Sequence, residues 1–210
     1  AGPPPAPAVR PRPPFEHLAD VRDGLGWDVR AESGALSADE PGGPPLRGVR
    51  VLDFGNFLAG PLADALLSEM GADVIKVEAV EGDPMRRTEF AFIACQRGKR
   101  SLAIDLKAPG AAAVVRRLFE WADLAHHNFR PGAAERLGID EATARAINPS
   151  LVYVHTPAFG SSGPKARLGG FDQMIQALCG IEAAAGGEGN PPVWLAAAPM
   201  DTGGGWLSTI

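Results

Sequence analysis

The sequence predicts an α/β fold in which a mainly parallel β-sheet carries helices on both faces. After residue 46, short apolar runs rich in β-branched residues alternate with segments whose apolar residues recur three and four positions apart. Short turns with Gly or Pro separate the two kinds of segment, which is typical of parallel strands joined by helices. The chain has 210 residues, of which 45% are hydrophobic, so it can bury the core that this fold needs.

The elements follow in order along the chain. The run GVRVLDF predicts a buried strand at 48–54, and AGPLADALLSEMGA predicts a helix at 59–72, with Pro near its first position and Gly71 at its end. The same criteria predict further strands at 72–78, 101–106, 123–129 and 150–156, and helices at 108–122 and 135–149. This alternation is that of a doubly wound, Rossmann-like sheet, in which ligands bind beyond the carboxyl ends of the strands.

The first part of the chain differs from the rest. Residues 1–46 hold a density of Pro and Gly that forbids regular structure, so we interpret them as a linker or tail, with one short helix conceivable within 15–29. Residues 47–210 are expected to hold the α/β domain. Because the chain opens without Met and stops at Ile210 within an expected helix, we expect it to be part of a longer protein.

The composition argues against several classes of function. Twenty Lys and Arg against 25 Asp and Glu give a formal net charge of -5, which argues against binding of nucleic acid through its phosphates. No apolar run approaches the ~20 residues of a membrane helix, and no signal peptide opens the chain, so we expect no membrane partner and a cytoplasmic location. Cys95 and Cys179 lack partners at metal-ligand spacing and are expected to be buried free thiols.

The common motifs for nucleotide and metal binding are absent from the sequence. It contains no G-x-G-x-x-G after the first strand, no P-loop, no H-E-x-x-H and no paired C-x-x-C, so we expect no metal site. His126 and His127 are adjacent at a strand end, where their side chains would point to opposite faces. We therefore expect them to be structural or exposed, and not to share a ligand.

One segment near the end of the chain points to chemistry. Asp201 follows an apolar, strand-like run and precedes Gly203, Gly204 and Gly205, which are expected to open a helix. The carboxylate of Asp201 is either an ordinary helix N-cap or a reactive group beside glycine amides. Such amides, at a helix N-terminus, hold an anion or the oxyanion of an acyl intermediate.

Five blocks of the sequence then occur in the order found in one family. They are GVRVLDFGNFLAGPLADALLSEMGADVIKVE, CQRGKRSLAIDLK, HHNFRPGAAERLGI, INPSLVYVHTPAFGSSGP and APMDTGGG. Together they resemble the signatures of the class III CoA-transferases, which include formyl-CoA transferase, carnitine CoA-transferase and α-methylacyl-CoA racemase. The resemblance covers about residues 46–210, and five blocks in register are far more specific than any one of them.

The resemblance implies which residues form the site. It places the nucleophilic aspartate of the family on Asp201, and it implies that CoA contacts Asn56, Phe57, Ala59, Ile104, Lys107, Asn128, Phe129 and Arg136. Lys107 and Arg136 are cations suited to the CoA phosphates, and Phe129 offers an apolar face to the adenine or pantetheine. We expect Lys107, Asn128, Phe129 and Arg136 to converge on one side of the sheet, near the carboxyl ends of the strands.

The resemblance also implies an activity. The expected reaction is transfer of coenzyme A between an acyl-CoA and a free carboxylic acid through a covalent aspartyl intermediate, with CoA as substrate and no permanently bound cofactor. Members of the family are longer than this chain and form interlocked dimers. We therefore expect the chain to be the N-terminal part of the large domain of a homodimeric protein, and the isolated piece to be inactive without the part that completes the domain and the dimer.

Two alternatives stay open at this point. Racemases of the same fold pair the aspartate with a histidine at the position of Phe171, which cannot exchange protons, so transfer is favoured over racemisation. A non-catalytic CoA-binding domain of a tandem protein is the other alternative. Formyl-CoA transferase has a glutamine where this chain has Leu58, so the formyl and oxalate pair of substrates is not expected.

Overall fold

A computed structural model describes residues 43–210, and these residues contain a five-stranded sheet. The strands are β1 (Arg50–Asp53), β2 (Asp73–Glu78), β3 (Arg100–Ala103), β4 (Leu124–His127) and β5 (Val152–His155). Their order is β3-β2-β1-β4-β5, and every neighbouring pair is parallel. The α/β prediction is therefore confirmed. The helix conceived within 15–29 and most of the expected linker lie outside the described residues.

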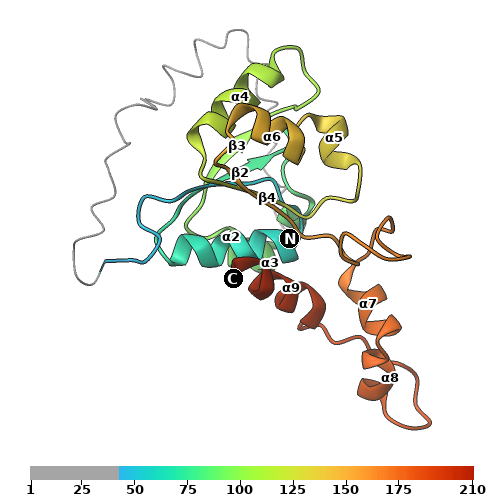
Figure 1. The fold of residues 1–210 in the computed structure, drawn as a ribbon. Coiled ribbons are helices and arrows are strands. Elements are labelled where there is room, and N and C mark those ends of the chain that lie inside the picture. Colours follow the sequence, from blue (N-terminus) through green and yellow to red (C-terminus); the bar gives the residue numbers. More distant parts are fainter. Residues whose placement is uncertain (1–42) are drawn as a thin grey trace, which may run out of the picture. The chain divides into compact units, whose positions relative to one another are not determined.

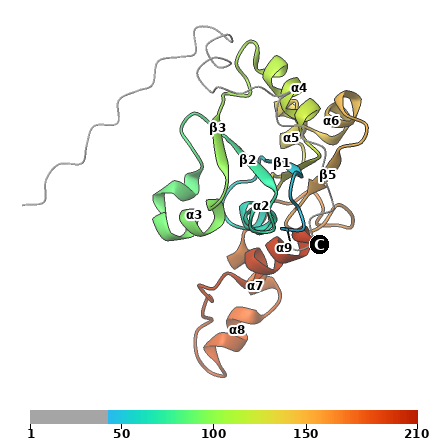
Figure 2. The same ribbon diagram turned by 90° about the vertical axis from the view of Figure 1, so that its left-hand side faces the viewer.

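Helices cover both faces of the sheet (Figures 1 and 2). On one face lie α2 (Ala59–Glu69), α3 (Glu89–Gln96) and α9 (Pro199–Thr209), with α9 packed against α2. On the other face lie α4 (Ala111–Trp121), α5 (Ala133–Leu137) and α6 (Glu141–Ile147). The chain runs outward from β1 to β3 and then returns to add β4 and β5 on the other side of β1, so the sheet is doubly wound as expected.

Helix α2 ends where the sequence predicts. Gly71 adopts a φ of +100°, which residues with a side chain rarely take, and a Cβ atom built there would lie 2.4 Å from Cβ of Pro44. The backbone N–H of Leu46 donates to the carbonyl of Met70 across the same turn, at 2.9 Å. Gly71 is therefore required both by its conformation and by the close approach of the preceding chain.

The helix expected at 135–149 is two helices. Gly138 has a φ of +67° and ends α5, and the carboxylate of Asp140 accepts a hydrogen bond of 3.0 Å from the backbone N–H of Thr143, which starts α6. The prediction of one continuous helix was wrong because Gly138 and the Asp140 cap were not weighed against the helical periodicity.

Several short helices were not predicted from the sequence. They are the 3₁₀ turn Pro84–Arg87, α3, α7 (Asp172–Leu178) and α8 (Ile181–Gly186). In α3 and α7 the large apolar residues are not on a buried stripe, since Phe90 is 88% exposed and Met174 is 49% exposed. Periodicity detects helices through such a stripe, so it passes over these segments.

The core lies between the sheet and its helices. Val51, Leu52 and Val74 are fully buried on the central strands, and Val51 and Val74 pack with Leu67 of α2. Phe119 of α4 is also fully buried, and the centroid of its ring lies 6.0 Å from that of Phe54. Cys95 is buried as expected, but Cys179 at the end of α7 is exposed, contrary to the prediction. Within residues 43–210, none of the helices is both long and apolar enough to cross a membrane.

Candidate active site

The candidate site lies where the chain reverses its direction of winding, between the carboxyl ends of β1 and β4. The two loops are tied together there, because the side chain of Asn128 accepts from the backbone N–H of Asn56 and donates to its carbonyl, both at 2.8 Å. Gly60 leaves the room that this requires, since a Cβ atom there would lie 3.0 Å from the Asn128 side chain. In open α/β sheets this crevice is where ligands bind.

Buried charged side chains hold the loop after β1 in place. The ammonium group of Lys76 donates to the carbonyl of Gly55 and lies 3.0 Å from the Asp83 carboxylate, whose other oxygen accepts from the amide of Phe57 at 3.4 Å. Phe57 itself has a φ of +62°, a conformation that costs a residue with a side chain about 1–2 kcal/mol. The surrounding contacts therefore impose a strained loop, as is common at functional sites.

A cleft of about 160 Å³ opens beside these loops. It is lined by residues that follow β1, β4 and β5 and by the start of α9, namely Ala59, Asn128–Pro131, Thr156–Ala158, Leu168–Phe171, Ile175, Met200, Asp201 and Gly204. The ring of Phe171 meets that of Phe57 edge to face at 5.9 Å, which closes one side. A cleft of this size is too small to enclose a whole drug-sized ligand, so it fits only one end of such a molecule.

Asp201 lies in the first turn of α9 and lines this cleft. Burial, and secondarily the negative charge of Asp172, raises the pKa of the Asp201 carboxyl to about 6. A carboxylate with a raised pKa in a cleft is a candidate for chemistry. The sequence placed Asp201 at the helix start, but the N-cap is Ala198, so Asp201 is the third residue of the helix and not its cap.

The N-terminus of α9 is already capped by Asp172, whose role the sequence analysis missed. One of its oxygens accepts from the amides of Met200 and Asp201 at 2.8 and 3.2 Å, and the other accepts from Trp194 at 3.1 Å and from Gln176. Burial alone would raise the pKa of Asp172, but these hydrogen bonds hold it below its ordinary value. Asp172 is therefore an anion that fixes the turn carrying Asp201. Its position directly after Phe171 is the one signal for it in the sequence.

Gly203, Gly204 and Gly205 were expected to open a helix, and the structure places them elsewhere. Gly203, Gly204 and Gly205 fall inside α9, where backbone amides donate to carbonyls four residues earlier. They do not open the helix, so their amides are committed to it in this structure. Gly205 is needed for packing, because a Cβ atom there would lie 3.1 Å from the carbonyl oxygen of Ala59 and from the Leu62 side chain.

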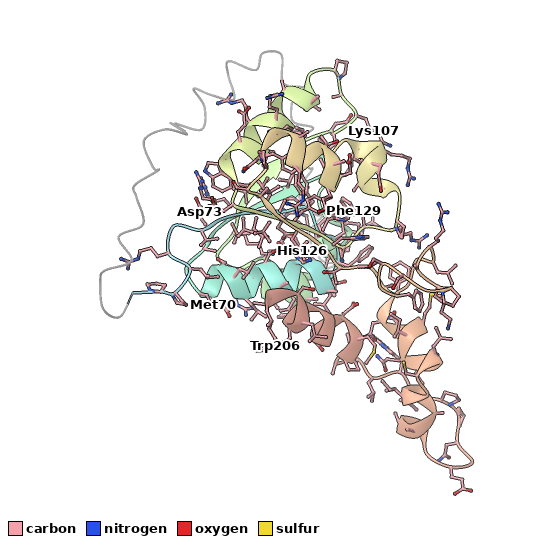
Figure 3. The ribbon with its side chains drawn as sticks, in the orientation of Figure 1. Met70, Asp73, Lys107, His126, Phe129 and Trp206 are labelled. Carbon is pink, nitrogen blue, oxygen red and sulfur yellow. The ribbon has the colours of Figure 1, made fainter. Side chains whose placement is uncertain are left out.

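The other residues named from the sequence fall at the same edge of the sheet, but not all line the cleft. Asn128 and Phe129 line it, whereas Lys107 and Arg136 are exposed and do not. Lys107 lies in the loop after β3, and Arg136 lies on α5; Figure 3 labels Lys107 and Phe129. Ile104 continues β3, with its amide donating to the carbonyl of Glu78 at 2.9 Å.

The two adjacent histidines of β4 point to opposite faces, as expected, and both are buried. His126 bonds to Asp64 of α2, while the ring of His127 stacks on that of His155 at 4.3 Å and lies beside Phe129. Burial and the neighbouring histidines lower the pKa of His127 to about 3, so it is neutral. Among the described residues, no group of three or more His, Cys, Asp or Glu side chains is arranged to hold a metal ion.

Comparison with known proteins identifies relatives of this chain. The family described as CoA-transferase family III matches residues 46–210. A succinate–glutarate CoA-transferase of Agrobacterium fabrum is 38% identical over 173 residues, which are 75% of this chain and 43% of that protein. A succinyl-CoA–D-citramalate CoA-transferase of Chloroflexus aurantiacus is 40% identical over 158 residues, which are 70% of this chain and 39% of that protein.

A solved structure also resembles this chain. The crystal structure of a CaiB/BaiF family protein from Brucella suis superposes with a TM-score of 0.75 at 36% identity, over 80% of this chain and 47% of that one. The chain therefore spans less than half of the length of the known relatives it matches.

Proposed function

The chain belongs to CoA-transferase family III, and we propose that the whole protein transfers coenzyme A between an acyl-CoA and a free carboxylic acid. The observation that carries the proposal is the carboxylate of Asp201, which lines a small cleft at the carboxyl edge of the sheet on a helix turn that Asp172 holds in place. Nucleophilic catalysis by a carboxylate needs this combination of access and fixed position.

In the proposed reaction, an oxygen of Asp201 attacks the thioester carbon and the C–S bond breaks, which yields a mixed anhydride and the CoA thiolate. The thiolate then attacks the aspartyl carbonyl and expels the first acid, leaving an aspartyl-CoA thioester. An acceptor carboxylate attacks this thioester and expels the thiolate, which gives a second mixed anhydride. The thiolate then attacks the acyl carbon of the acceptor and breaks its bond to the bridging oxygen, which stays on Asp201 as the new acyl-CoA leaves. The residue ends as a free carboxylate, so the cycle needs no oxidant, metal or bound cofactor.

We propose that CoA approaches along the loops after β1, β3 and β4. The tied loops of Asn56 and Asn128 would face the pantetheine arm, with Phe57, Ala59 and Phe129 beside it. The exposed cations Lys107 and Arg136 would meet the phosphates. Ile104 directly follows β3, in the same loop as Lys107, and would contact CoA beside it. The small volume of the cleft supports entry of the thioester end alone.

Transfer is favoured over racemisation by Phe171. Its ring lines the cleft and contacts Phe57, and it carries no proton that could be exchanged with a substrate α-carbon. In line with the family resemblance, we also propose that the whole protein is a cytoplasmic homodimer.

The proposed activity is tested with the full-length protein. Because the relatives are named for succinate, glutarate and citramalate, succinyl-CoA is the first donor, offered with a panel of free dicarboxylic and hydroxy acids. We expect a new acyl-CoA to form, measured by liquid chromatography. A parallel incubation of 2-methylacyl-CoA in D₂O reports racemisation; deuterium uptake without transfer would contradict the proposal.

The pH dependence of transfer should follow Asp201. Only the ionised carboxylate attacks, and its pKa is raised to about 6, so kcat/KM should rise as the pH increases through about 6. Asp172→Asn removes a negative charge that contributes to the raised pKa, so the midpoint should move to lower pH. A midpoint near ~4, the ordinary value of an aspartate, in the wild-type protein would contradict this assignment.

The tie between Asn56 and Asn128 should matter for CoA binding. Asn128→Ala removes both hydrogen bonds to the Asn56 backbone, so the Kd for CoA, measured by calorimetry, should rise by about ten-fold. Asn190→Ala in an exposed loop is the control and should leave the Kd unchanged. Equal affinities of the two variants would show that the tie does not shape the CoA site.

A further inference from the structure

A buried hydrogen-bonded chain connects α2 to the cleft and to the far end of α9. The carboxylate of Asp64 lies 3.0 Å from Nδ1 of His126, and Nε2 of His126 lies 2.8 Å from the hydroxyl of Thr156. The Thr156 hydroxyl is in turn 2.7 Å from that of Ser208. Figure 3 shows His126 between the sheet and α2. The hydrogen-bonded chain thus links α2, β4, the segment after β5 and α9, and one of its members, Thr156, lines the same cleft as Asp201.

Ser208, the last member of this hydrogen-bonded chain, determines which group donates in each of its hydrogen bonds. Ser208 donates its hydroxyl proton to the carbonyl of Gly204, at 2.8 Å, as a serine inside a helix commonly does. Its oxygen then accepts from Thr156, and the oxygen of Thr156 accepts from His126. Nε2 of His126 therefore carries a proton, whether the second shared proton lies on Nδ1 or on Asp64.

Packing alone does not account for this chain. Asp64 is fully buried and His126 is 2% exposed, and the Oδ1 atom of Asp64 has no hydrogen-bond partner among the described residues. Burying such a pair is expensive, and apolar residues of similar volume are often as stable or more stable at such sites. The hydrogen-bonded chain is thus a costly feature that includes a cleft-lining hydroxyl, that of Thr156.

Several other donors around the cleft are already committed. The amides of Met200 and Asp201 bond to Asp172, those of Gly203 to Gly205 lie inside the helix, and the Asn128 side chain bonds to Asn56. Arg130 also lines the cleft, but its guanidinium is 5.8 Å from the Phe171 ring centroid and the residue is exposed. The Thr156 hydroxyl needs only to turn from Ser208 to a ligand to donate into the cleft.

We propose that Thr156 is a further catalytic residue, whose hydroxyl, polarised by His126 and Asp64, donates a hydrogen bond to the acyl oxygen when Asp201 attacks. This inference rests on the proposed function. As the C–O bond to Asp201 forms, the π electrons of the carbonyl move to its oxygen, and Thr156 stabilises that charge while keeping its proton; the pair returns as the C–S bond breaks. His126 and Asp64 are positioning residues that act through Thr156.

Transfer should fall on the alkaline side of the pH profile. When the pair loses its shared proton, His126 keeps one proton on Nδ1 toward Asp64, and Thr156 must donate to Nε2. The Thr156 hydroxyl then cannot donate to the acyl oxygen, because its proton is committed to Nε2 of His126, so transfer should fall. The charged and titratable groups that face His126 are Asp64 on α2, Asp53 on β1, Lys99 before β3, and its neighbour His127. Burial lowers the pKa of His126, but Asp64 raises it above its ordinary value.

The test compares Thr156→Val with Thr156→Ser in the full-length protein. Valine keeps the shape and removes the hydroxyl, so kcat should fall by about 100-fold with little change in the KM for acyl-CoA, and the alkaline fall should disappear. Serine keeps the hydroxyl and should restore most of kcat and the alkaline fall. A Val variant with wild-type kcat and pH profile would overturn the proposal while leaving transfer through Asp201 intact.

A measurement on the unmodified protein serves if the Val variant does not fold. The ¹⁵N chemical shift of Nε2 of His126 should be that of a protonated nitrogen at the pH of maximal transfer, and that of a bare nitrogen on the alkaline side. A bare Nε2 at the optimum would overturn the proposal. Absence of transfer and of any Asp201 adduct in the wild-type protein would instead sink the proposed function, and this inference with it.

Discussion

Replacing Asp201 with Asn should lower CoA transfer by the full-length protein by about 10⁴-fold or more, because it removes the attacking carboxylate. The amide keeps the size of the side chain and part of its hydrogen bonding. The Kd for CoA should change little, since Asp201 lines the cleft that we propose for the acyl end and is not one of the proposed nucleotide contacts. Steady-state transfer assays and calorimetry measure the two effects separately.

Asp73→Asn provides the matched control for this variant. Asp73 begins β2 at the amino end of the strand, opposite the cleft, where it pairs with Arg100 at 2.5 Å and is partly exposed. The same chemical change there should leave transfer within about two-fold of wild type, because exposed ion pairs contribute little. Near-normal transfer by the Asp201→Asn variant would show that another residue is the nucleophile.

Replacing Lys76 with Met should lower the free energy of unfolding by about 3–5 kcal/mol, the usual effect of removing one partner of a buried ion cluster. The Lys76 ammonium is 2% exposed and lies 3.0 Å from Asp83 and 4.0 Å from Asp53, both of which are fully buried at their side chains. Lys76 and Lys99 hold the pKa of Asp53 at about 2, against the opposing effect of burial. Without Lys76, part of this negative charge is left uncompensated in the core.

Urea unfolding of the full-length protein measures this effect. Arg116→Met is the control, because the Arg116–Glu120 pair is 63% and 49% exposed at its side chains and should contribute less than about 1 kcal/mol. Equal stabilities of the Lys76 and Arg116 variants would mean that the buried cluster is not held together by Lys76. Because the loop after β1 rests on Lys76, CoA affinity should fall together with stability.

The sheet could be predicted from the sequence because its strands are short apolar runs between turn residues, and the parallel order followed from the intervening helices. The prediction of helices was less complete. The segment 135–149 splits at Gly138, and α3 and α7 carry exposed Phe90 and Met174, so local periodicity could not resolve them. The apolar side chains of α3 and α7 are not buried within the described residues. A helical period in a sequence becomes visible only when one face of the helix is apolar because it is buried.

The site was predicted in part. Asp201 and the Asn128 loop do line one cleft, but the start of α9 lies before Asp201, at Pro199, because the N-cap contacts come from Asp172, 29 residues earlier in the sequence. A single sequence cannot show that a distant carboxylate caps a helix. The same holds for His126, interpreted from the sequence as structural or exposed, whose partners on α2 and after β5 are brought together only by the fold.

Trapping of the aspartyl intermediate is the most direct test of the central claim. The full-length protein is incubated with acyl-CoA and hydroxylamine, and the modified residue is located by peptide mass spectrometry. An aspartyl anhydride or thioester is activated toward amines, so we predict a hydroxamate on Asp201 that requires acyl-CoA and is absent from the Asp201→Asn variant. A hydroxamate on another residue, or no adduct under conditions where transfer proceeds, would contradict the account.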